Sequence, residues 1–171
     1  MRILKAALIG GSCLAIFFAL PVAAQSQKPP VAEQSQKPAA SSAAQSTRIK
    51  SHRVVIQVTQ NDPAVMNLAL NNAENLTKYF TDKGEPIEIE FVAYGAGLNM
   101  VRSDTSPVKE RLKAMGGSMK NVTFSGCGNT LENQSRQEDK KITLVAEARL
   151  VPTGIARIVE LEEQGWSYVR P

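Results

Sequence analysis

RVVIQVTQNDP, residues 53–63, places a β-branched run directly before a helix start. The run at 53–58 is bounded by polar residues and predicts a buried strand. Asp62 followed by Pro63 is typical of a helix N-cap and its first helical position. The next apolar residues recur at spacings of three or four, which predicts one helix face ending near Gly84: Val65, Ala69, Ala73, Leu76 and Phe80.

The rest of the chain repeats this alternation of strands and helices. Apolar residues alternate with glutamates from residue 87, which predicts a strand over 87–94 before the glycine turn 95–97. Ser106-Pro107 predicts a short helix over 108–115 that stops at Gly116-Gly117. Later segments predict strands at 121–126, 146–151 and 166–169, a polar segment at 128–141 in which a helix can start at Asn129, and a helix after Thr153 with Ile155, Ile158, Val159 and the stem of Glu162 on one stripe and Gly165 at its end.

Strands and helices at this spacing are typical of βαβ units. The predicted fold is therefore α/β, with a mostly parallel sheet of about five strands and helices on both faces. Residues 51–171 form this one domain.

The N-terminus has the pattern of an export signal. Arg2 and Lys5 precede an apolar run from residue 6 to 20, and Val22-Ala23-Ala24 suits cleavage after Ala24. The run is shorter than a bilayer core requires, so no permanent membrane span is expected. Residues 1–24 are predicted to be a signal peptide and residues 25–50, rich in Gln, Ser, Lys and Pro, a disordered linker. The mature protein is then periplasmic or secreted.

Composition excludes several classes of function. The net charge of +4 comes from the signal and the linker, so the remaining domain is near neutral and no nucleic-acid partner is expected. One histidine and two cysteines cannot supply a typical metal cage or disulfide framework. Gly95-Ala96-Gly97 lacks the third glycine of a dinucleotide fingerprint, which favours close backbone packing over a cofactor. No cofactor or metal is predicted.

Sites in open α/β sheets form at the carboxyl ends of the strands. The residues that follow the first three predicted strands are therefore candidate ligand-binding residues, namely Asn61, Tyr94, Gly95, Gly97, Gly126, Gly128 and Asn129.

Cys127 is the candidate nucleophile. Cleavage of the signal removes Cys13 and leaves Cys127 as the single thiol. Glycine lies on both sides of it, and it falls between a strand end and a helix start, where backbone N–H groups favour a thiolate. We expect it to be partly exposed. Most lone cysteines are inert buried hydrophobes, which is the competing interpretation.

Five blocks in the same order resemble the DsrE/DsrF sulfur-relay family over residues 52 to 171. They are Asn67-Leu68-Ala69-Leu70-Asn71-Asn72-Ala73 with Asn75-Leu76, Glu90-Phe91-Val92-Ala93-Tyr94-Gly95-Ala96-Gly97-Leu98, Val122-Thr123-Phe124 with Gly126-Cys127-Gly128-Asn129-Thr130, Val151-Pro152-Thr153-Gly154, and Glu163-Gln164-Gly165-Trp166-Ser167-Tyr168. The resemblance implies a three-layer α/β/α subunit, a homo-oligomer (trimer or hexamer), a sulfur donor or acceptor protein as partner, and Cys127 as the persulfide-carrying cysteine. Relay members of that family work in the cytoplasm, whereas this chain has an export signal.

Three functions remain open from the sequence. The first is a persulfide carrier or sulfurtransferase-like protein that uses Cys127. The second is a non-catalytic oligomeric module that binds a small ligand at the strand ends, and the third is a thiol redox sensor.

Overall fold

The computed structural model describes residues 50–171. The predicted signal peptide and nearly all of the predicted linker lie outside these residues. Among the helices that are described, none is both long enough and apolar enough to cross a membrane.

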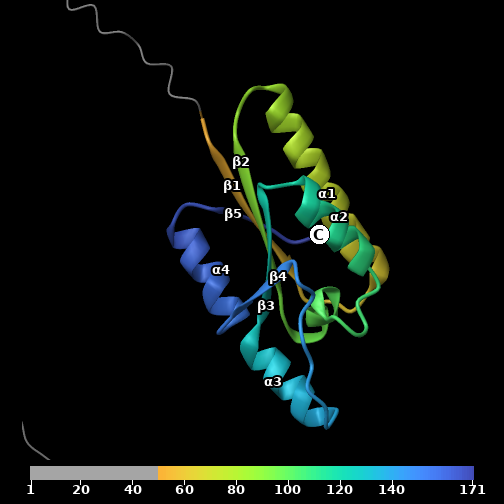
Figure 1. The fold of residues 1–171 in the computed structure, drawn as a ribbon. Coiled ribbons are helices and arrows are strands. Elements are labelled where there is room, and N and C mark those ends of the chain that lie inside the picture. Colours follow the sequence, from red (N-terminus) through yellow and green to blue (C-terminus); the bar gives the residue numbers. More distant parts are fainter. Residues whose placement is uncertain (1–49) are drawn as a thin grey trace, which may run out of the picture. The chain divides into compact units, whose positions relative to one another are not determined.

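Five parallel strands form one sheet in the order β4-β3-β2-β1-β5 (Figure 1). The strands are β1 (His52–Val58), β2 (Ile87–Ala93), β3 (Val122–Cys127), β4 (Ala148–Val151) and β5 (Ser167–Val169). The helices are α1 (Pro63–Asp82), the 3-10 helix η1 (Gly95–Val101), α2 (Lys109–Ser118), α3 (Gly128–Gln137) and α4 (Gly154–Glu163). The predicted α/β class is confirmed, with helices on both faces of the sheet.

The first β-α junction forms as its sequence predicts. Asp62 caps α1 by accepting a 2.7 Å hydrogen bond from the Ala64 N–H, and Pro63 is the first helical residue. The helix ends at Asp82, and Gly84 then adopts a φ of +69°, which a side chain would disfavour.

The two faces of the sheet carry different cores. On one face α1, η1 and α2 cover a large apolar cluster, in which the rings of Phe91 and Phe124 stack with centroids 5.1 Å apart. On the other face a small cluster joins Val55 and Val92 to Ile158 and Leu161 of α4. Figure 1 shows α4 on the opposite side of the sheet from α1 and α2.

The chain leaves β3 and β4 toward opposite faces. After β3 the chain enters α3, whose Leu131 packs against the large cluster, whereas after β4 it enters α4 on the other face. The carboxyl ends of β3 and β4 therefore form a switch point of the sheet, the kind of position where open α/β sheets bind ligands. Cys127 and Val151, the last residues of these strands, are paired in register.

Two local predictions were wrong, for the end of the helix predicted over 108–115 and for the stripe of the last helix. The helix predicted over 108–115 runs from Lys109 to Ser118, because Gly116 and Gly117 keep a helical backbone instead of the positive φ that ends helices. α3 forms within the predicted polar segment, close to the helix start expected at Asn129. Its side chains are mostly polar because it is a surface helix.

In α4 the predicted stripe is only partly buried. Gly154, Ile158 and Leu161 face the sheet, whereas Ile155 and Val159 are about half exposed. The helix packs on a narrow line, so the residues one position away from that line are turned outward.

Candidate functional site

Cys127 ends β3 and serves as the N-cap residue of α3. The residue is only 4% exposed, so the predicted partial exposure is wrong. The cause is close packing of the start of α4: a Cβ at Gly154 would lie 3.0 Å from Tyr94 and 3.2 Å from the Cys127 Cβ. Only glycine lets α4 approach the thiol this closely.

Two helix starts converge on the sulfur. Burial raises the pKa of the Cys127 thiol, but hydrogen bonds from the Thr130 hydroxyl and from the N–H groups of Gly154, Thr130 and Asn129 outweigh it, and the net pKa lies below the ordinary value. Asn129 and Thr130 belong to the first turn of α3, and Gly154 begins α4. Helix N-termini favour a negative charge, so the arrangement favours the thiolate, and the Asn129 N–H also donates to the Pro152 carbonyl at 3.2 Å.

The Thr130 hydroxyl is itself oriented. Its Oγ1 accepts a 3.1 Å hydrogen bond from the N–H of Gly95, whose φ is +57°. A hydroxyl has one proton and two lone pairs, and with a lone pair engaged by Gly95 its proton is directed to Cys127. The glycine turn after β2 thus supports the sulfur at the end of β3.

Tyr94 links the site to the rest of the α4 face. Its hydroxyl accepts a hydrogen bond from the Gln57 side-chain amide, and the Tyr168 hydroxyl donates to the Gln57 Oε1 at 2.5 Å. Gln57 is buried, so its amide needs partners at both ends, and these two bonds supply them. They also hold the Tyr94 ring beside Gly154.

Other predicted site residues also lie near Cys127. Gly128 packs against the carbonyl groups of Val151 and Pro152, where a Cβ would approach to 3.2 Å. The Asn129 side chain donates to the Thr153 Oγ1 at 3.0 Å, which joins the starts of α3 and α4. Gly126 packs against Leu144 and Val101 on the large-cluster side of β3.

Asn61 and Gly97 do not reach the thiol. Asn61 accepts a 2.8 Å hydrogen bond from Asn99 and lines a separate polar pocket of about 420 Å³ with Ala96, Asn99, Arg102, Thr105, Gln134, Gln137 and Glu138. Gly97 packs against the end of β1, since a Cβ there would lie 2.3 Å from the Val58 carbonyl oxygen. Close backbone packing, the interpretation favoured for this glycine pair, is confirmed at Gly97.

Two basic residues at the start of α2 are engaged with other groups. Lys109 donates to the Ser103 carbonyl, and Arg111 pairs with Glu74. Within residues 50–171 no cluster of three or more His, Cys, Asp or Glu side chains is placed to hold a metal ion.

The sequence analysis missed Thr130, Gly154 and a buried ionic cluster. Thr130 and Gly154 stand one turn or less after a strand end, so the rule that placed the other candidates also applies to them. The cluster joins Glu90 of β2 to Arg149 of β4 and Arg157 of α4. The alternating pattern of β2 marks Glu90 as lying on the face opposite Phe91, but its partners come from distant segments that periodicity does not connect.

Fold and site together define a class: a parallel α/β domain with a thiol of lowered pKa at the switch point of its sheet. No family model matches the chain, and no curated protein does. A solved structure of a protein of unknown function from Methanobacterium thermoautotrophicum is similar, with 31% sequence identity, a TM-score of 0.60, and coverage of 70% of this chain and 99% of that chain. The chain belongs to the same family as that archaeal protein.

Proposed function

We propose that the protein is a sulfur carrier of the DsrE/DsrF type in which Cys127 accepts and passes on sulfur as a persulfide. The observation that carries the proposal is the position of Cys127 as the N-cap residue of α3 beside the start of α4, where donors from Thr130, Gly154 and Asn129 hold the pKa of its thiol below the ordinary value despite burial. An inert core cysteine needs no such donors, whereas a thiolate and a persulfide anion both need them. The sequence blocks that resemble the family support the same assignment.

The chemistry requires one displacement in each direction. The Cys127 thiolate attacks the outer sulfur of a donor persulfide R–S–SH, the donor S–S bond breaks, and R–S⁻ leaves with its electron pair. The product is Cys127–S–SH, which loses its proton to the medium and is held by the same donors. Attack by an acceptor thiolate on the outer sulfur then returns Cys127 as the thiolate, with no outside oxidant or reductant.

Mass spectrometry of the intact protein tests this step. Incubation of the mature protein with glutathione persulfide should add the mass of one sulfur atom, and dithiothreitol should remove it. Cys127→Ser, a nearly isosteric change, should keep the fold by circular dichroism and gain nothing. Sulfur uptake by the serine variant, or no uptake by the folded wild-type protein, contradicts the proposal.

The same experiment separates a thiol redox sensor from a carrier. A sensor should gain oxygen from hydrogen peroxide faster than it gains sulfur from the persulfide. A carrier should show the opposite order at equal reagent concentration.

A small-ligand module is the second candidate, favoured by the polar pocket at Asn61. Its lining is dominated by amide and hydroxyl side chains, which suit an uncharged polar ligand. Ala96→Trp should fill this pocket and leave Cys127 untouched. A ligand whose binding is lost in Ala96→Trp and kept in Cys127→Ser would favour this candidate.

Export and assembly are further parts of the proposal. The signal pattern supports a periplasmic or secreted location, and N-terminal sequencing of the natural protein should begin at Gln25. Half-exposed apolar side chains at Leu150, Ile155 and Val159 support a homo-oligomer. Sedimentation at micromolar concentration should show a trimer or hexamer, and a monomer contradicts this part.

A further inference from the structure

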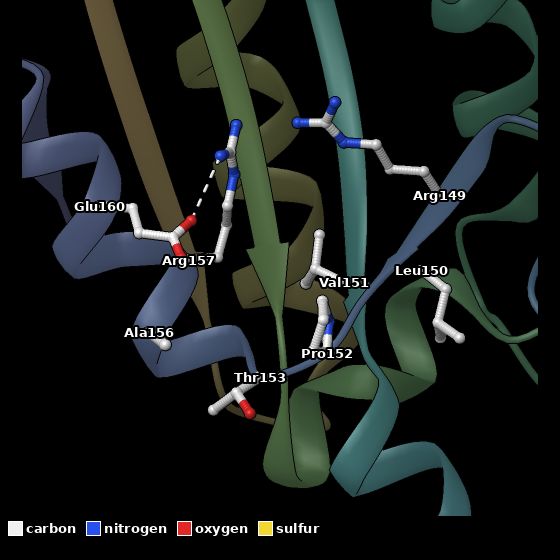
Figure 2. Close-up of a pocket in the computed structure, with 8 residues that line it drawn as sticks. All are labelled: Arg149, Leu150, Val151, Pro152, Thr153, Ala156, Arg157 and Glu160. Atoms are coloured by element: carbon white, nitrogen blue, oxygen red, sulfur yellow. Dashed lines mark ion pairs between the residues drawn. The ribbon is translucent and has the colours of Figure 1, made fainter.

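A pocket of about 340 Å³ opens between β4 and the start of α4. It is lined by Arg149, Leu150, Val151, Pro152, Thr153, Ala156, Arg157 and Glu160 (Figure 2). One end of the pocket reaches Val151 at the end of β4, whereas Arg149 pairs in register with Ser125, two residues before Cys127. Cys127 itself is not part of the lining.

Two arginines reach into this region from different elements. In Figure 2 Arg149 extends from β4 toward α4, and the Arg157 guanidinium rises from α4 beside it. A second hollow of about 300 Å³ is lined by both arginines as well, together with Lys120. The guanidinium groups therefore stand between two open spaces.

Glu90 fixes the arginines in place. This carboxylate is 2% exposed and accepts from Arg157 Nε at 3.0 Å and Nη2 at 2.8 Å. Arg149 Nη2 lies 2.8 Å from Glu90 Oε2, the oxygen that also accepts from Arg157 Nη2, and Arg149 Nε donates to Ser125 Oγ at 3.0 Å. Two guanidinium groups thus share one buried carboxylate, and the exposed Glu160 is the second carboxylate that balances their charge.

Both arginines keep donors for a ligand. A guanidinium has five N–H donors, and the bonds to Glu90 and Ser125 use the Nε and Nη2 sides. The Nη1 of Arg157 is 3.5 Å from Glu160, the one acidic side chain in the pocket lining. Glu160 is mostly exposed, so it is able to turn away into water when another anion arrives.

We propose that this pocket binds the oxyanion group of a small molecule, such as a sulfonate or carboxylate, with Arg149 and Arg157 as its binding residues. Planar guanidinium groups held in place by a buried carboxylate suit the paired oxygens of such a group. The inference goes beyond the proposed function, because Glu90 pairs in register with Thr123, four residues before Cys127, and the guanidinium groups therefore lie away from the thiol.

Sulfate is the probe, because it is an oxyanion that cannot transfer sulfur to Cys127. Calorimetric titration at constant ionic strength should detect sulfate binding to the wild-type protein. Arg149→Gln should weaken binding by about tenfold, the loss of roughly one charge-assisted hydrogen bond. Arg149 is half exposed, so this variant should fold, and circular dichroism checks that. Glu160→Gln should tighten binding by freeing Arg157 Nη1.

Glu163→Gln is the matched control. It removes the same charge from the same helix, but Glu163 does not line the pocket, so sulfate affinity should stay at the wild-type value. Equal effects of Glu160→Gln and Glu163→Gln on sulfate affinity would show that only the net charge of the helix matters, and would overturn the proposal. Unchanged affinity in folded Arg149→Gln, or no sulfate binding in the wild type, would overturn it as well.

The outcomes distinguish this inference from the carrier function. Sulfate should bind Cys127→Ser as it binds the wild type. If sulfate binds with the expected Arg149 dependence and the wild type takes up no sulfur, the carrier function is contradicted and oxyanion binding in the pocket is supported. If the wild type takes up sulfur and sulfate does not bind, oxyanion binding in the pocket is contradicted and the carrier function is supported. Acetate in place of sulfate separates carboxylates from sulfur oxyanions.

Discussion

On the face covered by α1 and α2 the sheet presents apolar side chains, whereas on the face covered by α4 it presents a glutamate, a serine and a glutamine, all buried. The first face buries a large cluster, whose stabilisation grows with area and depends little on orientation. The second face buries four apolar residues, so directional bonds determine where α4 sits. The environment of the Cys127 thiol depends on that placement through Gly154. Stability and site geometry are thus concentrated on opposite faces of the sheet.

A large-to-small substitution on the apolar face should have the largest effect, and it tests whether stability and site geometry are separate. Phe91 is fully buried and stacks on Phe124. Phe91→Ala should lower the free energy of unfolding by about 3–5 kcal/mol. Urea denaturation measures this, and the pH midpoint of Cys127 alkylation should stay the same if the variant still folds. A shift of that midpoint would show that the two faces are coupled.

Arginine truncations on the α4 face should cost less and affect the thiol more. Arg157→Ala removes the bidentate partner of a buried carboxylate and should cost about 3 kcal/mol, whereas Arg149→Ala, at a half-exposed side chain, should cost about 1 kcal/mol. Arg157→Ala should also raise the alkylation midpoint, because α4 loses its anchor on β2 and Gly154 moves from Cys127. Equal midpoints in the two variants would contradict the positioning role of Arg157.

Acid should weaken the α4 face selectively. Burial raises the pKa of Glu90, but hydrogen bonds from Arg157, Ser125 and Arg149 outweigh it and leave the pKa below its usual range. The stabilisation is therefore complete above the unfolded glutamate pKa of about 4.3 and is lost as the pH falls through the lower folded value. Wild-type stability should fall over this range more steeply than that of Glu90→Gln. Parallel curves would show that Glu90 is not the group that titrates.

The smallest expected effect concerns the Thr130 hydroxyl. Thr130→Val removes a donor to Cys127 and should raise the pH midpoint of alkylation by iodoacetamide, with little change in stability, since Thr130 is partly exposed. Thr130→Ser keeps the hydroxyl and should keep the midpoint. The midpoint is the quantity to compare, because burial of Cys127 slows the absolute rate. Identical midpoints in the valine and serine variants would show that the Thr130 hydroxyl does not stabilise the Cys127 thiolate.

Local rules predict much of this fold, because the signals lie within a few residues of their effects. Asp62-Pro63 begins a helix through its own N–H groups, and β-branched runs form strands wherever neighbours cover them. Gly116 and Gly117 misled the prediction because glycine permits a helix end without requiring one.

The site was predictable only in part. Its place at the strand ends follows from parallel topology, and Cys127, Tyr94 and Asn129 were found in this way. Whether a strand-end residue touches the thiol depends on how α3 and α4 dock, which sequence spacing does not specify. Asn61 and Gly97 therefore fell outside the site and Gly154 inside it.

The contact between Gly154 and Cys127 also determines when, during synthesis, the surroundings of the thiol are complete. Synthesis from the N-terminus completes β1 to β3 and the apolar face before α4 exists. Until residues 149–157 arrive, Cys127 lacks the Gly154 N–H, and Glu90 lacks both arginine partners. A chain interrupted before residue 154 would lack the Gly154 donor, so the pKa of its Cys127 thiol should be higher than in the folded domain, although Asn129 and Thr130 still lower it.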